Sequence, residues 1–139
     1  MDRSLQQKST TDEIAARFDA DVERFTHLEC GQSATVDAPL AMELITRAAS
    51  AATPCIRHVL EIGCGAGNNT IKLLRTVPEG FACDLNDLSA RMLERARERV
   101  EKETHLEVRL FLGDFRKLTF PEGHYDVVLA AAVLHHLRD

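Results

Sequence analysis

Residues 59–69 read Val-Leu-Glu-Ile-Gly-Cys-Gly-Ala-Gly-Asn-Asn, an apolar run that ends in three alternating glycines. The apolar run is typical of a buried β-strand, and a helical pattern continues from residue 69 to residue 75. Glycines between a strand and a helix let the chain turn sharply and let a ligand approach the backbone. The start of the helix adds unpaired N–H groups and a positive dipole end. The segment therefore predicts a turn that suits a carboxylate or a phosphate.

The spacing of the glycines distinguishes several kinds of turn. A dinucleotide-binding turn has the pattern G-x-G-x-x-G, but here Asn68 stands at the place of the third glycine and the pattern is G-x-G-x-G. A P-loop has Lys followed by Ser or Thr after its last glycine, and two asparagines follow Gly67 instead. For the glycines taken alone, a strand-to-helix connection without a ligand remains an alternative.

Short apolar runs alternate with helical patterns from residue 54 to the end of the sequence. Helices are predicted at 69–75, at 89–102 and from about 133, and strands at 57–62, 81–87, 106–112 and 125–131. This alternation predicts right-handed βαβ units, a parallel sheet and an α/β fold. The fourth strand is rich in valine and leucine, which predicts burial on both of its faces.

Two extra helices are predicted before the first strand. The first has Thr11 or Asp12 as its N-cap, and its apolar residues at helical spacing are Ile14, Phe18, Val22 and Phe25. The second begins near residue 37 with Pro39 in its first turn, and its predicted apolar face consists of Leu40, Leu44, Ile45 and Ala48. Together they form a predicted cap segment, residues 1–53, before an α/β domain at 54–139.

Composition limits the class of protein. Of the 139 residues, 45% are hydrophobic and 28% are charged, which is ordinary for one globular domain. The 22 acidic and 17 basic side chains give a net charge of −5, which argues against a broad nucleic-acid surface. The polar N-terminus and the lack of an apolar run of about 20 residues predict a cytoplasmic protein without a membrane segment. The four cysteines show no metal-ligand spacing, so reduced thiols and no metal are predicted.

The acid two residues before G-x-G-x-G makes the turn resemble the first motif of the class I (Rossmann-like) S-adenosylmethionine-dependent methyltransferases. The resemblance implies that the turn wraps the methionine end of S-adenosyl-L-methionine, with Glu61, Gly63, Gly65 and Gly67 as motif residues. It also implies a three-layer αβα arrangement around a sheet that has seven strands in the family. The resemblance runs from Val59 to the last residue, so the predicted domain is truncated after its fourth strand.

A second motif follows the second strand. Residues 87–93, Asp-Leu-Ser-Ala-Arg-Met-Leu, resemble the D-L-S-x-x-M-L motif of the same family. The resemblance implies that Asp87 accepts the two ribose hydroxyls and that Leu88 lies against the adenine. Asp84 is the alternative acid, because its separation from Gly63 is closer to the roughly 20 residues of dinucleotide-binding folds.

Two further segments extend the resemblance. Residues 113–115, Gly-Asp-Phe, resemble the family's G-D-A/F element, which implies that Asp114 accepts the adenine amino group and that the backbone N–H of Phe115 reaches a ring nitrogen. Residues 125–137 resemble the F/Y-D-V-V-x-x-x-x-V-L-H-H-L segment of many small-molecule methyltransferases. The resemblance implies that Ala131 lies at the cofactor. His135 follows the carboxyl end of the fourth strand, where open α/β sheets bind ligands, and is a candidate general base or acceptor-site residue. A capping or solvent-facing role is the alternative for His135.

The same segment bears on the acceptor. It lacks the N/D-P-P-Y/F motif of enzymes that methylate amino groups of nucleic-acid bases, which favours a small-molecule acceptor. A tRNA-modifying methyltransferase is the alternative enzyme, and Arg91, Arg95 and Arg99 lie at i+4 spacing on one predicted helix. A solvated helix face is the simpler interpretation of these arginines.

A non-catalytic, cofactor-binding module is the third hypothesis. It would form a homodimer through the apolar edge of the fourth strand, which a truncated sheet leaves unpaired. In related enzymes an N-terminal segment covers the cofactor and shapes the acceptor pocket. Phe18, Phe25 and residues 31–35 are predicted either to do so or to pack as ordinary helical residues.

Overall fold

A single parallel sheet organises the chain, whose computed structural model describes residues 8–26, 38–131 and 133–136. Within them, the sheet has the order β3-β2-β1-β4, and its strands are β1 His58–Ile62, β2 Ala82–Asp87, β3 Val108–Leu112 and β4 Val127–Leu129. All three strand pairs are parallel. Each strand lies inside its predicted range, and the α/β, Rossmann-like fold class is confirmed.

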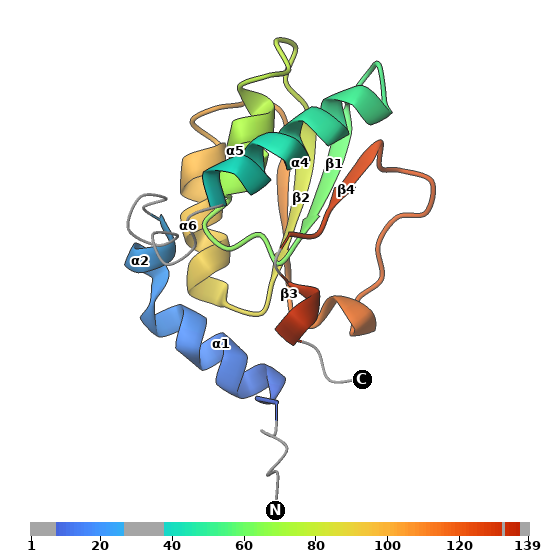
Figure 1. Ribbon diagram of the computed structural model, residues 1–139. Helices are drawn as coiled ribbons and strands as arrows, with labels where there is room; N and C mark the ends of the chain where they lie inside the picture. The colour runs from blue at the N-terminus through green and yellow to red at the C-terminus, as the bar shows by residue number, and fades with distance from the viewer. Residues whose placement is uncertain (1–7, 27–37, 132, 137–139) are drawn as a thin grey trace, which may run out of the picture.

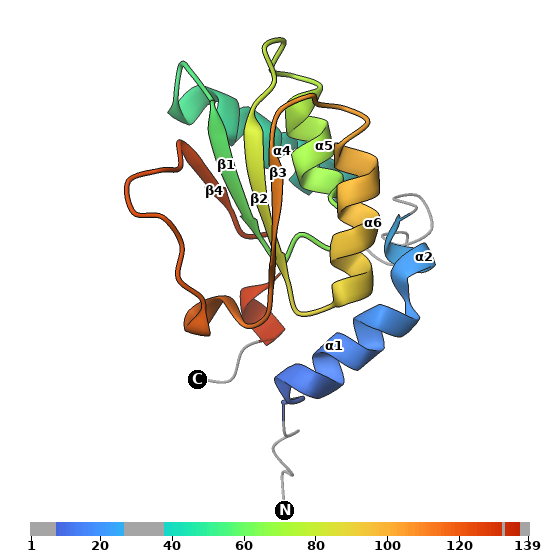
Figure 2. The same ribbon diagram turned by 180° about the vertical axis from the view of Figure 1, so that it is seen from behind.

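Three helices cover one face of this sheet: α4 Ala38–Ala52, α5 Asn68–Leu74 and α6 Ala90–Val100. In Figure 2 the strands pass in front of α4. The opposite face carries the β3–β4 connection, which includes the 3-10 helix η1 Phe115–Lys117 and packs Phe120 against Phe111. The described residues thus show the sheet and one helical layer of the predicted three-layer arrangement.

The main core lies between the sheet and these helices. Val59, Cys83 and Leu85 of the sheet are buried, and the helices add Ala49, Ile71, Leu73, Leu74, Leu93, Ala96 and Val100. Val127 and Leu129 of β4 are also buried, but Val128 between them is 54% exposed. The prediction that β4 is buried on both faces is therefore wrong, because the described helices cover only the face to which Val127 and Leu129 point.

The predicted first helix forms as two, α1 Thr11–Ala20 and α2 Val22–Thr26. The N-cap of α1 is Thr10, so the prediction of Thr11 or Asp12 is wrong by one or two positions. The reason is a capping box. The Thr10 side chain accepts from the Glu13 N–H at 3.2 Å, and the Glu13 carboxylate accepts from the Thr10 N–H at 2.7 Å.

The apolar face predicted for α4 is also wrong in part. Leu40 is 58% exposed and Leu44 is 57% exposed, and Ala48 is exposed as well. The buried stripe is instead Met42, Thr46 and Ala49, with Ile45 half-buried. This stripe obeys helical spacing too, and the position of α4 beside α5 decides which stripe is buried. Because Ala49 belongs to the main core, α4 packs into the α/β domain, and the division at residue 53 stays a prediction.

Several segments gather at the carboxyl ends of the strands. Helix α1, η1 and a second 3-10 helix, η2 Leu134–His136, all lie at this end in Figure 1. The helix predicted from about residue 133 is this single turn within the described residues. None of the helices in the described ranges is both long and apolar enough to cross a membrane.

Candidate functional site

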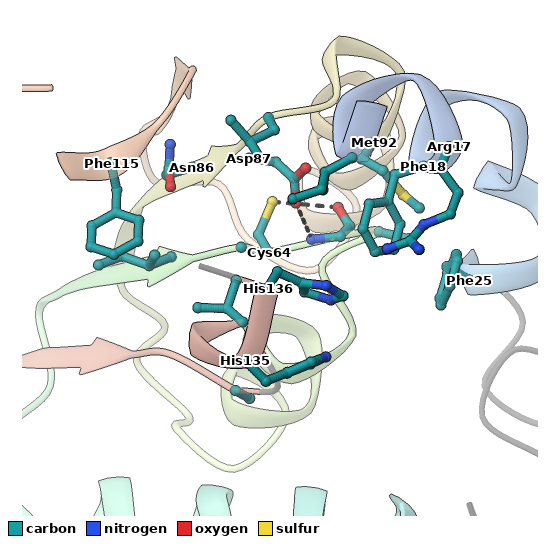
Figure 3. A pocket seen from close by; sticks show the side chains of 18 of the residues that line it. Arg17, Phe18, Phe25, Cys64, Asn86, Asp87, Met92, Phe115, His135 and His136 are labelled. Carbon is teal, nitrogen blue, oxygen red and sulfur yellow. Dashed lines mark hydrogen bonds between the residues drawn. The ribbon is translucent and has the colours of Figure 1, made fainter. Parts of the chain in front are cut away.

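A cavity of about 850 Å³ opens at the carboxyl end of the sheet. Its walls come from the strand ends on one side and from α1, α2, α4 and η2 on the other. The predicted cofactor residues that line it are Gly63, Gly65, Asp87, Leu88, Asp114, Phe115 and Ala131. His135 and His136 line it as well, and Figure 3 shows both beside the cavity. Open parallel sheets bind ligands at this end, so the cavity is the candidate site.

The glycine turn presents bare backbone to the cavity. Gly65 has φ +52°, and a Cβ built there would meet no atom within 4 Å, because the space beside it is open. Gly63 has φ +64°, and its Cβ would lie 1.9 Å from Cγ2 of Val133. One glycine therefore leaves room for a ligand, and the other lets the segment after β4 approach the turn.

Glu61 and Gly67 are not among the residues that line the cavity. The buried Glu61 carboxylate accepts hydrogen bonds from Asn69 Nδ2 at 3.2 Å, from the Thr70 N–H at 3.2 Å and from the Thr70 hydroxyl. Burial raises its pKa to about 7, although these hydrogen bonds oppose the shift. Glu61 thus ties β1 to the first turn of α5, while Gly67 lets α5 approach α6 closely.

The two candidate acids of β2 have different surroundings. Asp87 lines the cavity, and its carboxylate accepts from the Gly65 N–H and the Ser89 N–H, both at 2.9 Å. Burial raises its pKa, and these backbone donors counteract the rise. Asp84 lies on the other face of the sheet, where it binds Arg109 at 2.8 and 2.7 Å and accepts from the Tyr125 hydroxyl. The structure therefore brings Asp87 to the cavity and ties Asp84 into a network away from it.

The loop after β3 is positioned by Asn86. Its Nδ2 donates to the backbone oxygens of Phe111 and Gly113, both at 2.9 Å. Asp114, at the end of this loop, accepts from the Arg116 guanidinium, which holds the pKa of the carboxyl below its usual range. The role of Asn86 was not predicted, and its one sequence signal was a polar residue in a strand position that apolar residues usually occupy.

The wall of the cavity formed by α1, α2 and η2 is aromatic. Phe18 and Phe25 lie with ring centroids 5.1 Å apart, and the Phe18 ring meets the His136 ring edge-on at 5.6 Å. Both phenylalanines line the cavity (Figure 3), and both pack against a small buried cluster of Val22, Ala66 and Met92. The two phenylalanines therefore both pack against the helices and line the cavity. Residues 31–35 lie outside the described ranges.

The two histidines differ in exposure. His135 is exposed, His136 is half-buried, and their ring centroids are 3.9 Å apart. Burial lowers the pKa of His136, and the nearby charges of His135 and Arg17 lower it further. His136 is therefore mainly neutral near pH 7 and available as a proton acceptor. The assignment of His135 as base stays a prediction, and the structure adds His136 beside it.

The arginines of α6 hold the N-terminal helices. The Asp19 carboxylate accepts from the Ser89 hydroxyl, and Arg91 donates from its backbone N–H to that carboxylate and from its side chain to the Asp19 carbonyl. Arg95 forms an ion pair with Glu23. The interpretation of this row as a solvated face is therefore wrong, because α1 and α2 lie across the start of α6.

The third arginine of the row supports the glycine turn. Arg99 donates to the Ala66 carbonyl at 2.7 Å and to Asn68 Oδ1 at 2.6 Å. Asn68 in turn donates to the Phe25 carbonyl at 3.0 Å. This chain of hydrogen bonds connects α6, the glycine turn and α2, and only the folded arrangement reveals it.

Other chemistry at the site is limited. Burial raises the pKa of the Cys64 thiol well above its usual range, so the thiol beside the glycines stays protonated. Cys55, Cys64 and Cys83 are free thiols, and Cys30 lies outside the described residues. Within the described ranges, no group of three His, Cys, Asp or Glu side chains comes together as a metal site.

The sequence is similar to those of known methyltransferases. A family model described as "Methyltransferase domain" matches residues 59–139. An uncharacterised methyltransferase of Schizosaccharomyces pombe is 34% identical over 88 residues, which cover 59% of this chain and 31% of that protein. A malonyl-[acyl-carrier protein] O-methyltransferase of Halalkalibacterium halodurans is 37% identical over 84 residues, which cover 58% of this chain and 30% of that protein. The chain thus spans about a third of the length of these relatives.

A solved structure shares the fold. Magnesium protoporphyrin IX methyltransferase (ChlM) of Synechocystis, solved with bound S-adenosylmethionine, has a TM-score of 0.71 at 18% identity. The match covers 97% of this chain and 67% of that one. The matching family model begins in β1 and includes the glycine turn and the three motifs that follow it. The chain therefore belongs to the methyltransferase-domain family and has its class I, Rossmann-like fold.

Proposed function

We propose that this chain supplies the cofactor-binding part of a methyltransferase that transfers a methyl group from S-adenosylmethionine to a small-molecule acceptor. The observation that carries the proposal is one continuous cavity of about 850 Å³ that joins the glycine turn to the aromatic wall of α1 and α2. This volume lies toward the upper end of the roughly 300–1,000 Å³ of small-molecule sites. The cavity thus has room for an acceptor beside the cofactor.

The residues of the turn fit the cofactor. Gly65 leaves open space where any other residue would place a side chain. The buried Oδ1 of Asn69, which also lines the cavity, has no hydrogen-bond partner in the described structure. A buried acceptor without a partner is costly unless a ligand supplies the donor. We assign the methionine end of the cofactor to this region, the ribose to Asp87, and the adenine to Leu88, Asp114 and Phe115.

When bound, S-adenosylmethionine would supply a methyl group on a positively charged sulfur. An acceptor lone pair would bond to that carbon, and the electrons of the broken sulfur–carbon bond would return to the sulfur. The chain's own residues position the acceptor and exclude water. Phe18, Phe25 and Met92 supply apolar walls for this purpose. For a hydroxyl acceptor, His135 is the proposed base that takes the proton, and His136 lies against it.

The alternatives have less support. Arg91, Arg95 and Arg99, the row that suggested a tRNA surface, are all engaged within the chain. The similarity to an O-methyltransferase whose name gives a malonyl acceptor favours a carried or small acceptor over a nucleic acid. A cytoplasmic location and self-association through β4, where Val128 is exposed, stay predictions. Mass measurement at several concentrations tests the second.

Calorimetry tests the proposed cofactor site. The chain is titrated with S-adenosylmethionine and with NAD, and Asp87→Ala is compared with Asp12→Ala, an exposed change on α1. We expect saturable binding of S-adenosylmethionine alone and a loss of at least tenfold, about 1.4 kcal/mol, with Asp87→Ala only. Binding of NAD instead, or equal affinity in both variants, would overturn the assignment.

A further inference from the structure

Two arginines at the acceptor side of the cavity differ from the other arginines. Arg17 and Arg24 both line the cavity and are exposed to solvent. Every other arginine in the described ranges makes a hydrogen bond or an ion pair: Arg47, Arg57, Arg75, Arg91, Arg95, Arg97, Arg99, Arg109 and Arg116. Arg17 and Arg24 have no such partner there, and each contacts only an aromatic ring by a described interaction. Their charges are therefore uncompensated at the rim of the site.

The rings beneath these arginines form one apolar wall. The Arg17 guanidinium carbon lies 5.2 Å from the Phe18 ring centroid, and that of Arg24 lies 5.8 Å from the Phe25 centroid. The two rings are themselves in contact at 5.1 Å, and Figure 3 shows Arg17 beside them. Stacking on a ring holds a guanidinium in place while its N–H groups stay available for an anion.

Acidic side chains that line the same cavity leave this rim positive. Asp114 is bound to Arg116, and Asp87 is bound to two backbone N–H groups on the cofactor side. Asp21 lies on the cavity wall, but it forms no ion pair within 4 Å with Arg17 or Arg24 in the described structure. Two cations thus face one acid at this end of the cavity, and the proposed positively charged cofactor would add to the excess.

We infer that the acceptor carries an anionic group, a carboxylate or a phosphate, next to an apolar body. Arg17 and Arg24 hold the anion at the rim, and Phe18 and Phe25 contact the apolar body. Guanidinium groups bind carboxylate and phosphate oxygens through charge-assisted, often paired hydrogen bonds, which explains why two arginines occur together here. This inference rests on the proposed function, because it assigns the glycine turn to the cofactor and the opposite wall to the acceptor.

Binding of small probes tests the inference. The full chain, saturated with S-adenosylhomocysteine, is titrated by calorimetry with 3-phenylpropanoate, 3-phenylpropyl phosphate and the uncharged 3-phenylpropanamide. We expect one of the anions to bind at millimolar concentration or below, and the amide to bind at least about tenfold more weakly, which corresponds to about 1.4 kcal/mol. The carboxylate and the phosphate arms decide which anion the rim prefers.

Charge-removing variants provide the second arm. The double variant Arg17→Gln, Arg24→Gln is expected to bind the anion about tenfold more weakly. Its affinities for the amide and for S-adenosylhomocysteine should stay within twofold of those of the wild type. Arg97→Gln, on the exposed face of α6, is the matched control and should change nothing. All three arginine-to-glutamine substitutions concern exposed side chains, and equal melting temperatures verify folding.

Each other outcome is informative. If neither anion binds, or if the amide binds equally well, the inference is wrong while the cofactor assignment stands. If the double variant instead binds S-adenosylhomocysteine more weakly, the arginines contribute to cofactor binding and the inference is again wrong. If S-adenosylhomocysteine itself does not bind to the folded chain, the proposed function fails first.

Discussion

Glu61→Gln tests how the buried carboxyl behind the glycine turn affects stability. Glu61 is 1% exposed, and burial raises its pKa from the ordinary 4.5 to about 7. Since one pKa unit corresponds to about 1.4 kcal/mol, this difference is worth about 3 kcal/mol between the two protonation states. The amide has nearly the same shape as the acid, but it does not ionise. The amide nitrogen of glutamine cannot accept a hydrogen bond, so the variant also loses part of the contacts from Asn69 and Thr70, an offset that does not vary with pH. The pH dependence of the difference therefore reports the cost of the charge.

The pH range of the effect follows from the sign of the shift. Below pH 4.5 the carboxyl is protonated in both the folded and the unfolded chain, and ionisation costs nothing. Between pH 4.5 and about 7 the unfolded chain releases the proton and the folded chain retains it, so the free energy of unfolding falls as the pH rises. Above about 7 the folded chain carries the full cost.

Urea denaturation measures this directly. The free energy of unfolding of wild type and Glu61→Gln is determined at several values between pH 4.5 and 8. We expect the variant to gain about 3 kcal/mol relative to wild type across this range. Glu98→Gln, an exposed change on α6, should follow wild type. A difference that stays constant with pH would refute the reasoning, because the carboxylate would then be fully compensated by Thr70 and Asn69.

Other perturbations address single contacts. Gly63→Ala should lower the free energy of unfolding by about 2–4 kcal/mol in urea, because φ is +64° and a Cβ would lie 1.9 Å from a methyl group after β4. Asp19→Asn should speed amide exchange in α1 about tenfold, because it weakens the bond from the Ser89 hydroxyl. Arg17→Gln should raise the pKa of His136 in an NMR titration, because a nearby positive charge is removed.

Each of these results has a clear contrary outcome. Unchanged stability of Gly63→Ala would mean that the segment after β4 does not rest on the turn. Equal exchange rates in Asp19→Asn would mean that the other contacts to α6 suffice to hold α1. If the pKa of His136 does not change in Arg17→Gln, the charge of Arg17 does not act on His136.

Much of the fold followed from local pattern. The strand ranges and α6 were predictable because apolar periodicity reports directly on which residues face a core. Motif spacing selected Gly63, Gly65 and Asp87, since glycines and an acid at strand ends carry a strong local signal. Two of the failures concern Leu44 and Val128, whose apolar side chains are exposed. Periodicity shows that a helix or a strand has an apolar face, and neighbours decide whether that face is covered.

The sequence by itself determined the alternation of strands and helices, the glycine turn and the motifs that identify the family. Only the tertiary structure decided that Asp84 is tied to Arg109 while Asp87 reaches the cavity. It also decided that Arg91 and Arg95 hold α1 and α2, whereas Arg17 and Arg24 line the cavity. The physical reason is that ion pairs and burial depend on segments far apart in the chain, whose approach no local spacing encodes.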